Sequence, residues 1–201
     1  MVYFTGKGDK GKSIIGDKKI SKDNFIIETL GELDELNSLI GLAKSHLTKI
    51  ETNLCSACFA NQRKHKHSHS LNEKLTNIQN NLFIIQANIA YLLYKKFKPP
   101  MLSKDSLAML EKEIMSIEDK ISPKNKFIIY GSEKNSAWLD YLRAVSRRIE
   151  RRLIVLSKKY HLDETIIAYL NRLSSYFYAW ARYLAYIKKI SEQEPWYNKD
   201  K

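Results

Sequence analysis

Residues 143–152 read RAVSRRIERR, and this basic stretch carries the clearest helical pattern in the chain. On an α-helix of 3.6 residues per turn, the apolar side chains in and around it fall on one stripe. The stripe consists of Leu142, Val145, Ile149, Leu153 and Leu156. Arg143, Arg147 and Glu150 follow one edge of the stripe, and the remaining arginines, Arg148, Arg151 and Arg152, are expected to reach solvent. Charges beside a buried seam need a partner or an anionic ligand, so the helix is a candidate wall of an anion site. The alternative is a solvated basic face.

Four more segments have the same periodicity. Helices are predicted over residues 25–47, 71–97, 103–121 and 163–189, with the basic helix over 133–160. Pro99 and Pro100 should end the second helix, and Pro123 follows the third. Residues 127–130, FIIY, are too short for a dependable strand and are expected to form a buried loop. Five amphipathic helices with short connections predict an all-α, five-helix up-and-down bundle.

Length and charge restrict the possible classes of protein. At 201 residues the chain fits one domain, and its net charge of +12 favours an anionic partner such as nucleic acid or a polyphosphate. No apolar run is long enough to span a bilayer, and the N-terminus does not resemble a signal peptide. The 2 cysteines cannot staple a fold of this size, which suggests a reducing, cytoplasmic location.

The first 23 residues lack helical period and are expected to form an extended N-terminal arm. Within it, GKGDKGKS at residues 6–13 matches both the P-loop and the dinucleotide-binding expressions. Both folds are rejected because no buried strand precedes the glycines and no helix follows them. The exposed backbone N–H groups and the lysines still suit a phosphate chain, and a flexible basic terminus is the alternative.

Two further features have two interpretations each. Asp34 lies within the apolar pattern of the first long helix, so either an arginine of the basic helix pairs with it or it is a solvated acid. Cys55 and Cys58, followed by His65, His67 and His69, have zinc-ligand chemistry, but the irregular spacing favours an exposed loop insertion over residues 48–70 without a structural metal. Residues 191–201 are polar and are expected to form a mobile tail.

Taken together, the motifs resemble those of the PduO-type ATP:cob(I)alamin adenosyltransferases, in the family's order. The opening T-x-T-G-D-x-G-x-T loop reads TGKGDKGKS at residues 5–13, with Lys7 at the second threonine. The other matching segments are ISKD at 20–23, GELDELNSLIG at 31–41, IQNNLF at 78–83, RAVSRRIER at 143–151 and LNRLS at 170–174. The family's F-x-x-P-G-G loop reads FIIYGS at 127–132, so Tyr130 and Ser132 depart from the pattern.

The resemblance implies a homotrimer of ferritin-like five-helix bundles, with active sites between subunits. There the 5′-deoxyadenosyl group of ATP would move to the cobalt of cob(I)alamin with release of triphosphate, and Mg²⁺ would accompany the phosphates. ATP would be bound by Thr5, Gly6, Gly8, Asp9, Gly11, Lys12, Ser13, Lys22, Arg147, Glu150 and Asn171. Asp34 and Arg143 would form an ion pair on the corrinoid side, and Phe127 would cover the lower face of the corrin. Arg147, Arg143, Asp34 and Phe127 would thus be the catalytic residues.

Two other classes of function compete with this one. A non-catalytic ATP- or cobalamin-binding sensor or carrier is favoured by the altered YGS loop. A nucleic-acid-binding bundle is supported by net charge alone, so nucleic acid is not the expected partner. A membrane is not expected either, because no apolar run is long enough to span a bilayer. A cobalamin reductase is a possible protein partner of the enzyme.

Overall fold

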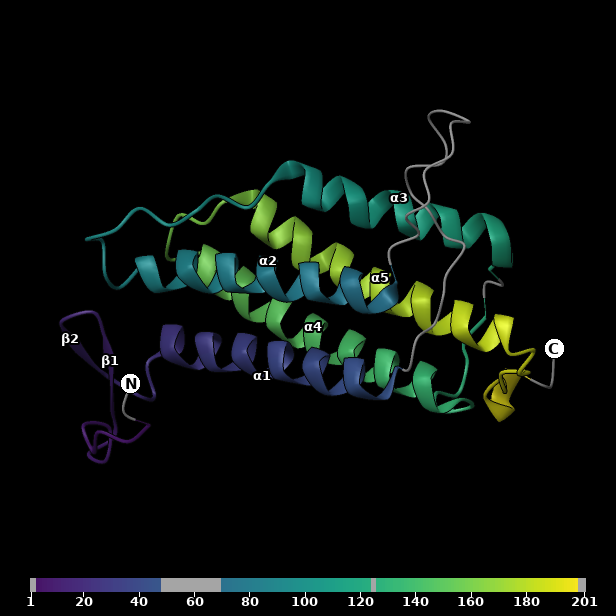
Figure 1. Ribbon diagram of the computed structural model, residues 1–201, viewed down its shortest axis with the longest axis horizontal. Coiled ribbons are helices and arrows are strands. Elements are labelled where there is room, and N and C mark those ends of the chain that lie inside the picture. Colours follow the sequence, from purple (N-terminus) through teal and green to yellow (C-terminus); the bar gives the residue numbers. More distant parts are fainter. Residues whose placement is uncertain (1–2, 48–69, 124–125, 199–201) are drawn as a thin grey trace.

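The computed structural model describes residues 3–47, 70–123 and 126–198, and it confirms the five-helix bundle. Successive helices run in opposite directions along the long axis of the molecule (Figure 1). They are α1 (Phe25–His46), α2 (Leu71–Tyr91), α3 (Lys104–Ile121), α4 (Lys134–Ser157) and α5 (Glu164–Ile187). None of the helices in the described ranges is long and apolar enough to cross a membrane.

Polar side chains fix the starts of the helices. Asn24 caps α1 by accepting a hydrogen bond from the Ile26 N–H. Ser70 and Glu73 form a capping box at the start of α2, and Asp163 caps α5. These caps satisfy N–H groups that no helical carbonyl can reach, and so they set where each helix begins.

Helix α5 lies at the centre of the packing, in contact with both α3 and α4. Its buried face includes Leu173, Phe177, Trp180 and Leu184, all fully excluded from water. The predicted apolar stripe of α4 is also buried, from Leu142 to Leu156. The helical period therefore identified the core correctly.

The N-terminal arm differs from the predicted extended loop because it contains a β-hairpin. Strand β1 (Lys12–Ile15) pairs antiparallel with β2 (Lys18–Ser21). At the turn, Gly16 has φ of +62°, and a Cβ there would lie 2.5 Å from the ring of Tyr94. Asp17 pairs with Lys96 beside it. The hairpin thus packs on the segment that follows α2. Helix α2 ends at Tyr91 and not at residue 97 as predicted, and the residues after it contact the hairpin instead.

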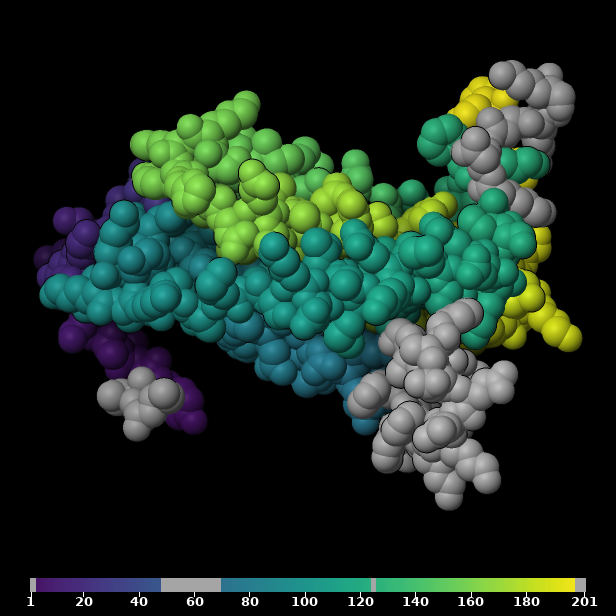
Figure 2. All heavy atoms as spheres, turned by 90° about the horizontal axis from the view of Figure 1, so that it is seen from above, coloured from purple at the N-terminus to yellow at the C-terminus, as the bar shows by residue number. Residues whose placement is uncertain are grey.

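The C-terminal segment packs against the bundle as far as residue 198. The Ile129 N–H donates to the carbonyl of Gln193 at 2.7 Å, and Lys126 pairs with Glu194 at 2.8 Å. A short 3₁₀ turn, Trp196–Asn198, follows. This segment therefore lies against residues 126–129 at one end of the bundle, whereas the arm projects from the other end (Figure 2).

Candidate active site

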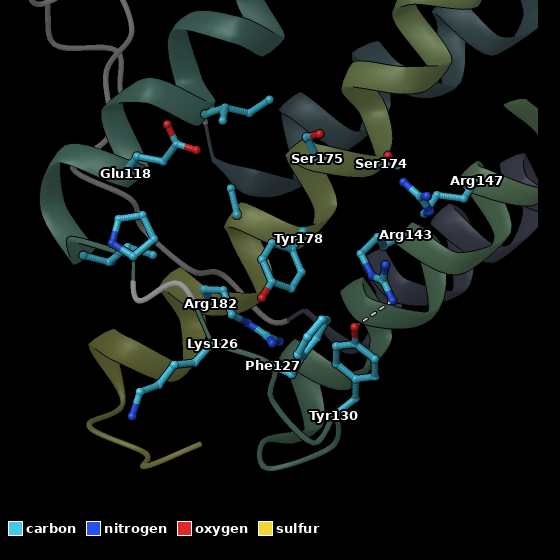
Figure 3. Close-up of a pocket in the computed structure, with 14 residues that line it drawn as sticks. Glu118, Lys126, Phe127, Tyr130, Arg143, Arg147, Ser174, Ser175, Tyr178 and Arg182 are labelled. Carbon is cyan, nitrogen blue, oxygen red and sulfur yellow. Dashed lines mark hydrogen bonds between the residues drawn. The ribbon is translucent and has the colours of Figure 1, made fainter. Parts of the chain in front are cut away.

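A cleft of about 460 Å³ opens between the C-terminal part of α3, the middle of α4, the middle and C-terminal part of α5, and the loop that precedes α4. Its polar lining comes from Glu118, Lys126, Tyr130, Arg143, Arg147, Ser174, Ser175, Tyr178 and Arg182. Figure 3 shows these side chains around the hollow, with Phe127 beside Tyr130. The lining of the cleft thus combines apolar side chains with several cations, and it suits a large ligand that is partly apolar and partly anionic.

The two arginines predicted to form an anion wall both line this cleft. Arg143 donates from Nη2 to the Tyr130 hydroxyl at 3.0 Å, and its guanidinium lies 4.9 Å from the centre of the Tyr130 ring. Arg147, one helical turn further on, is exposed and makes no hydrogen bond or ion pair within the described parts of the chain. Its five N–H donors are therefore available to an anion from outside the protomer.

Two other arginines of α4, Arg148 and Arg152, are partly exposed as expected but also pair with acids of α1. Arg148 pairs with Glu35 of α1. Arg152 contacts Glu32 at 3.1 Å and Glu28 at 3.5 Å. The basic helix packs beside an acidic face of α1, and half-exposed pairs of this kind contribute about 0.2–1 kcal/mol each. These pairs link α4 to α1, whereas Arg147 has no such partner among the described residues.

Phe127 is not buried, contrary to the predicted buried loop. Its side chain is 73% exposed, and Ile129 and Tyr130 are half exposed. The loop crosses the end of the bundle, where no further helix covers it, so its apolar side chains remain open at the cleft. A phenylalanine held in this position is available to a flat apolar ligand.

Glu150 and Asn171, predicted to orient the nucleotide, are brought together across α4 and α5. Asn171 donates from Nδ2 to Glu150 Oε1 at 2.7 Å, and its Oδ1 accepts from Arg172 at 2.6 Å. Arg172 in turn pairs with Glu111 at 2.8 Å. The amide is therefore fixed in one orientation, which gives the site a defined hydrogen-bonding group.

The glycine-rich part of the arm folds as two consecutive turns. The Asp9 N–H donates to the Gly6 carbonyl at 3.3 Å, and the Gly11 N–H donates to the Gly8 carbonyl at 3.2 Å. Gly6 and Gly11 have φ of +63° and +71°, values that favour glycine. The Lys22 Nζ lies beside Gly8, where an added Cβ would be 3.5 Å from it. Thr5, Lys12 and Ser13 flank these turns in the sequence.

Within one protomer, this arm does not meet the cleft. The hairpin lies at the end of the bundle where α1 begins (Figure 1), whereas the cleft is lined by the C-terminal part of α3 and by residues 126, 127 and 130, toward the other end. Asp34 is exposed on α1, in a shallow depression with Gln79 and Phe83 of α2, and it makes no ion pair with Arg143 of the same chain. Cys55, Cys58, His65, His67 and His69 lie outside the described residues.

Comparison with known proteins identifies the family. Residues 3–184 match the sequence profile of the family described as cobalamin adenosyltransferase. A corrinoid adenosyltransferase of Bacillus subtilis (strain 168) is 33% identical over 183 residues, which cover 90% of this chain and 86% of the relative. The human corrinoid adenosyltransferase MMAB is 32% identical over 208 residues, 98% of this chain and 73% of the relative.

The chain belongs to the cobalamin adenosyltransferase family. Its activity is that of an ATP:corrinoid adenosyltransferase. Among solved structures, a variant PduO-type ATP:corrinoid adenosyltransferase of Lactobacillus reuteri complexed with cobalamin and ATP superposes with a TM-score of 0.80 at 27% identity, over 96% of this chain and 98% of that one. Another variant of the same enzyme, complexed with ATP, gives a TM-score of 0.76 at 28% identity, over 96% and 99% of the two chains.

Sequence reasoning missed one charged cluster beside the cleft of this adenosyltransferase, and only its Arg182 lines the cleft. Arg182, which is 8% exposed, donates to Asp140 at 2.5 Å and lies 3.1 Å from Glu192. Burial raises the pKa of Asp140 and of Glu192, and the Arg182 cation offsets only part of that rise. The signal was present in the sequence: Arg182 is the one charge in the aromatic run YFYAWARY, and a charge inside such a run needs a buried partner.

Proposed function

We propose that the cleft of this adenosyltransferase binds the corrinoid, that the arm binds ATP, and that the two substrates meet between neighbouring protomers of a homotrimer. The cobalt of cob(I)alamin uses its electron pair to attack C5′ of ATP. A cobalt–carbon bond forms as the C5′–O bond breaks, and triphosphate leaves with the bonding electrons. Because the reduced cobalt is itself the nucleophile, the protein contributes position and charge.

Support for a shared site comes from the distance between its parts. The arm and the cleft lie toward opposite ends of one bundle, so a single protomer does not bring a nucleotide on its own arm to its own cleft (Figure 1). A second copy placed against the α1–α2 face would cover Asp34 and the 60% exposed Phe83. Buried Arg143 Nε has no hydrogen-bond partner among the described residues, and the Asp34 carboxylate of that neighbour is the partner we assign to it.

The triphosphate is bound by cations and by backbone N–H groups. Arg147, Lys12 and Lys22 neutralise its developing charge, while Thr5, Ser13 and the turns around Asp9 shape the cradle. Glu150 and Asn171 orient the nucleoside. Mg²⁺ at this position would be carried mainly by phosphate oxygens and water. Bound there, Mg²⁺ would supply additional positive charge to the leaving group.

Phe127 acts on the corrinoid. Its exposed ring at the cleft would lie against the lower face of the corrin and keep a fifth ligand from cobalt(II), which makes the cobalt easier to reduce. The phenylalanine and the arginine that are substituted in the Lactobacillus reuteri structures have the same separation in sequence as Phe127 and Arg147. An electron donor such as a cobalamin reductase, in the cytoplasm, completes the proposed cycle.

The observation that carries the proposal is the unpaired Arg147 in the same cleft as the exposed Phe127. The test is an assay with ATP, Mg²⁺, cob(II)alamin and a chemical reductant, in which adenosylcobalamin is followed by absorbance and triphosphate by ion chromatography. We expect both products in equal amounts. Release of orthophosphate without adenosylcobalamin would contradict the proposed chemistry.

Two variants separate the parts of the proposal. Phe127→Ala should still bind ATP but lose the four-coordinate cobalt(II) signature in paramagnetic resonance spectra. Phe83→Glu, which places a charge on the α1–α2 face, should shift the sedimenting species from trimer toward monomer. A monomeric parent protein with full activity would refute the shared site.

A further inference from the structure

Tyr130 lies in the loop before α4, close to two of the arginines that line the cleft. Its hydroxyl accepts a hydrogen bond from Arg143 at 3.0 Å, and its ring centre lies 4.9 Å from the Arg143 guanidinium and 5.9 Å from that of Arg182 (Figure 3). Tyr130 is nevertheless half exposed, so these contacts are made by the face and hydroxyl of a ring whose other side is open to the cleft.

The groups that Tyr130 contacts are held in place by other parts of the protein. Arg182 is buried, pairs with Asp140, and lies 4.9 Å from the ring of Tyr178. Arg143 projects from the rigid α4 helix and lies 5.8 Å from the same Tyr178 ring. Two guanidinium groups and two phenol rings therefore alternate along the wall of the cleft. Because the guanidinium groups are partly removed from water, their attraction to the rings is stronger than at an open surface.

The backbone after Tyr130 offers no comparable restraint. Gly131 has φ of +97° and no atom within 4 Å of where a Cβ would stand. Residues 131 and 132 are glycine and serine, so the turn is not stiffened by proline. Apart from the hydrogen bond of the Ile129 N–H to the Gln193 carbonyl and the pair of Lys126 with Glu194, the position of this loop depends on side-chain contacts, and Tyr130 makes those that face the cleft.

We propose that Tyr130 is a positioning residue that anchors the loop on Arg143 and Arg182 and thereby aims Phe127, three residues earlier, into the corrinoid cleft. The inference rests on the proposed role of Phe127 and deepens it. The same hydrogen bond restrains the Arg143 guanidinium at the edge of the cleft. Tyr130 itself does not have to touch the cobalt or the transferred adenosyl group.

Two substitutions divide the contacts of Tyr130. Tyr130→Phe keeps the ring between the guanidinium groups and removes the hydrogen bond, whereas Tyr130→Ala removes both. We expect the KM for the corrinoid to rise about tenfold in Tyr130→Ala and less in Tyr130→Phe, with the KM for ATP unchanged, since the anchor contributes about one hydrogen bond and one cation–π contact. The fraction of four-coordinate cobalt(II) formed in the presence of ATP should fall in the same order.

Tyr141→Ala is the matched control, because Tyr141 is 48% exposed on α4, close to the 50% of Tyr130, and does not line the cleft. Equal four-coordinate fractions in the parent, Tyr130→Phe and Tyr130→Ala would overturn the inference on Tyr130 alone. A rise in both KM values together would also overturn it, because that pattern indicates general disorder of the site. If the parent protein forms no four-coordinate cobalt(II), the role of Phe127 fails first and the inference fails with it.

Discussion

Replacing Arg147 with alanine tests whether this arginine of α4 serves catalysis and not the stability of the fold. In the protomer this side chain is exposed and makes no ion pair or hydrogen bond among the described residues, so its loss should change the free energy of unfolding by no more than about 0.5 kcal/mol. Removal of one preorganised charge from a transition state costs about 2.7–4 kcal/mol, which corresponds to a decrease in kcat of about 10²–10³-fold. The variant should therefore be folded and nearly inactive.

The measurements are denaturant unfolding and the initial rate of adenosylcobalamin formation at saturating ATP. Arg147→Lys keeps the charge but loses the paired N–H donors, and it should recover only part of the rate. Lys158→Ala, which removes an exposed cation at the end of the same helix, is the control for a general effect of charge. A kcat within about threefold of the parent would show that triphosphate is stabilised elsewhere.

Three further substitutions follow from the structure. Gly16→Ala, at φ of +62° and with its Cβ 2.5 Å from the Tyr94 ring, should undock the hairpin and raise the KM for ATP without changing that for the corrinoid, as steady-state kinetics would show. Asp140→Ala leaves the buried Arg182 cation without its closest partner and should lower the free energy of unfolding by about 3–5 kcal/mol in denaturant titrations. Burial raises the pKa of Glu192, so the folded state binds that proton more tightly than the unfolded state does, and the stability of the fold falls as pH rises from the ordinary value of 4.5 toward the raised pKa. Over this pH range the melting temperature of Glu192→Gln should rise relative to that of the parent. A difference in melting temperature that does not change with pH would refute the assignment.

The fold was largely predictable because helical period and proline positions reflect local physics. The apolar stripe predicted from Leu142 to Leu156 is buried in the core on α4. The hairpin was not predictable on the same grounds. Its strands are four residues each and gain their stability from docking on Tyr94 and Lys96, which are distant in sequence.

The site was predictable in its residue types but not in its pairing. Spacing placed Arg143 and Arg147 on one edge of α4, and both line the cleft. Spacing could not show that Arg148 and Arg152 face acids of α1, because the rotation of one helix against another is set by the packing of the whole bundle. The exposure of Phe127 depends likewise on where the bundle ends, and apolar composition alone suggested a buried loop.

The separation of arm and cleft within one bundle has a genetic consequence. If each catalytic centre is completed by two copies of the chain, a copy with a defective hairpin and a copy with a defective cleft are both inactive alone, yet a hybrid oligomer contains a centre built from their two sound parts. Pairs of inactive alleles should therefore complement one another when one damages the hairpin and the other the cleft, and should fail to do so when both damage the same element.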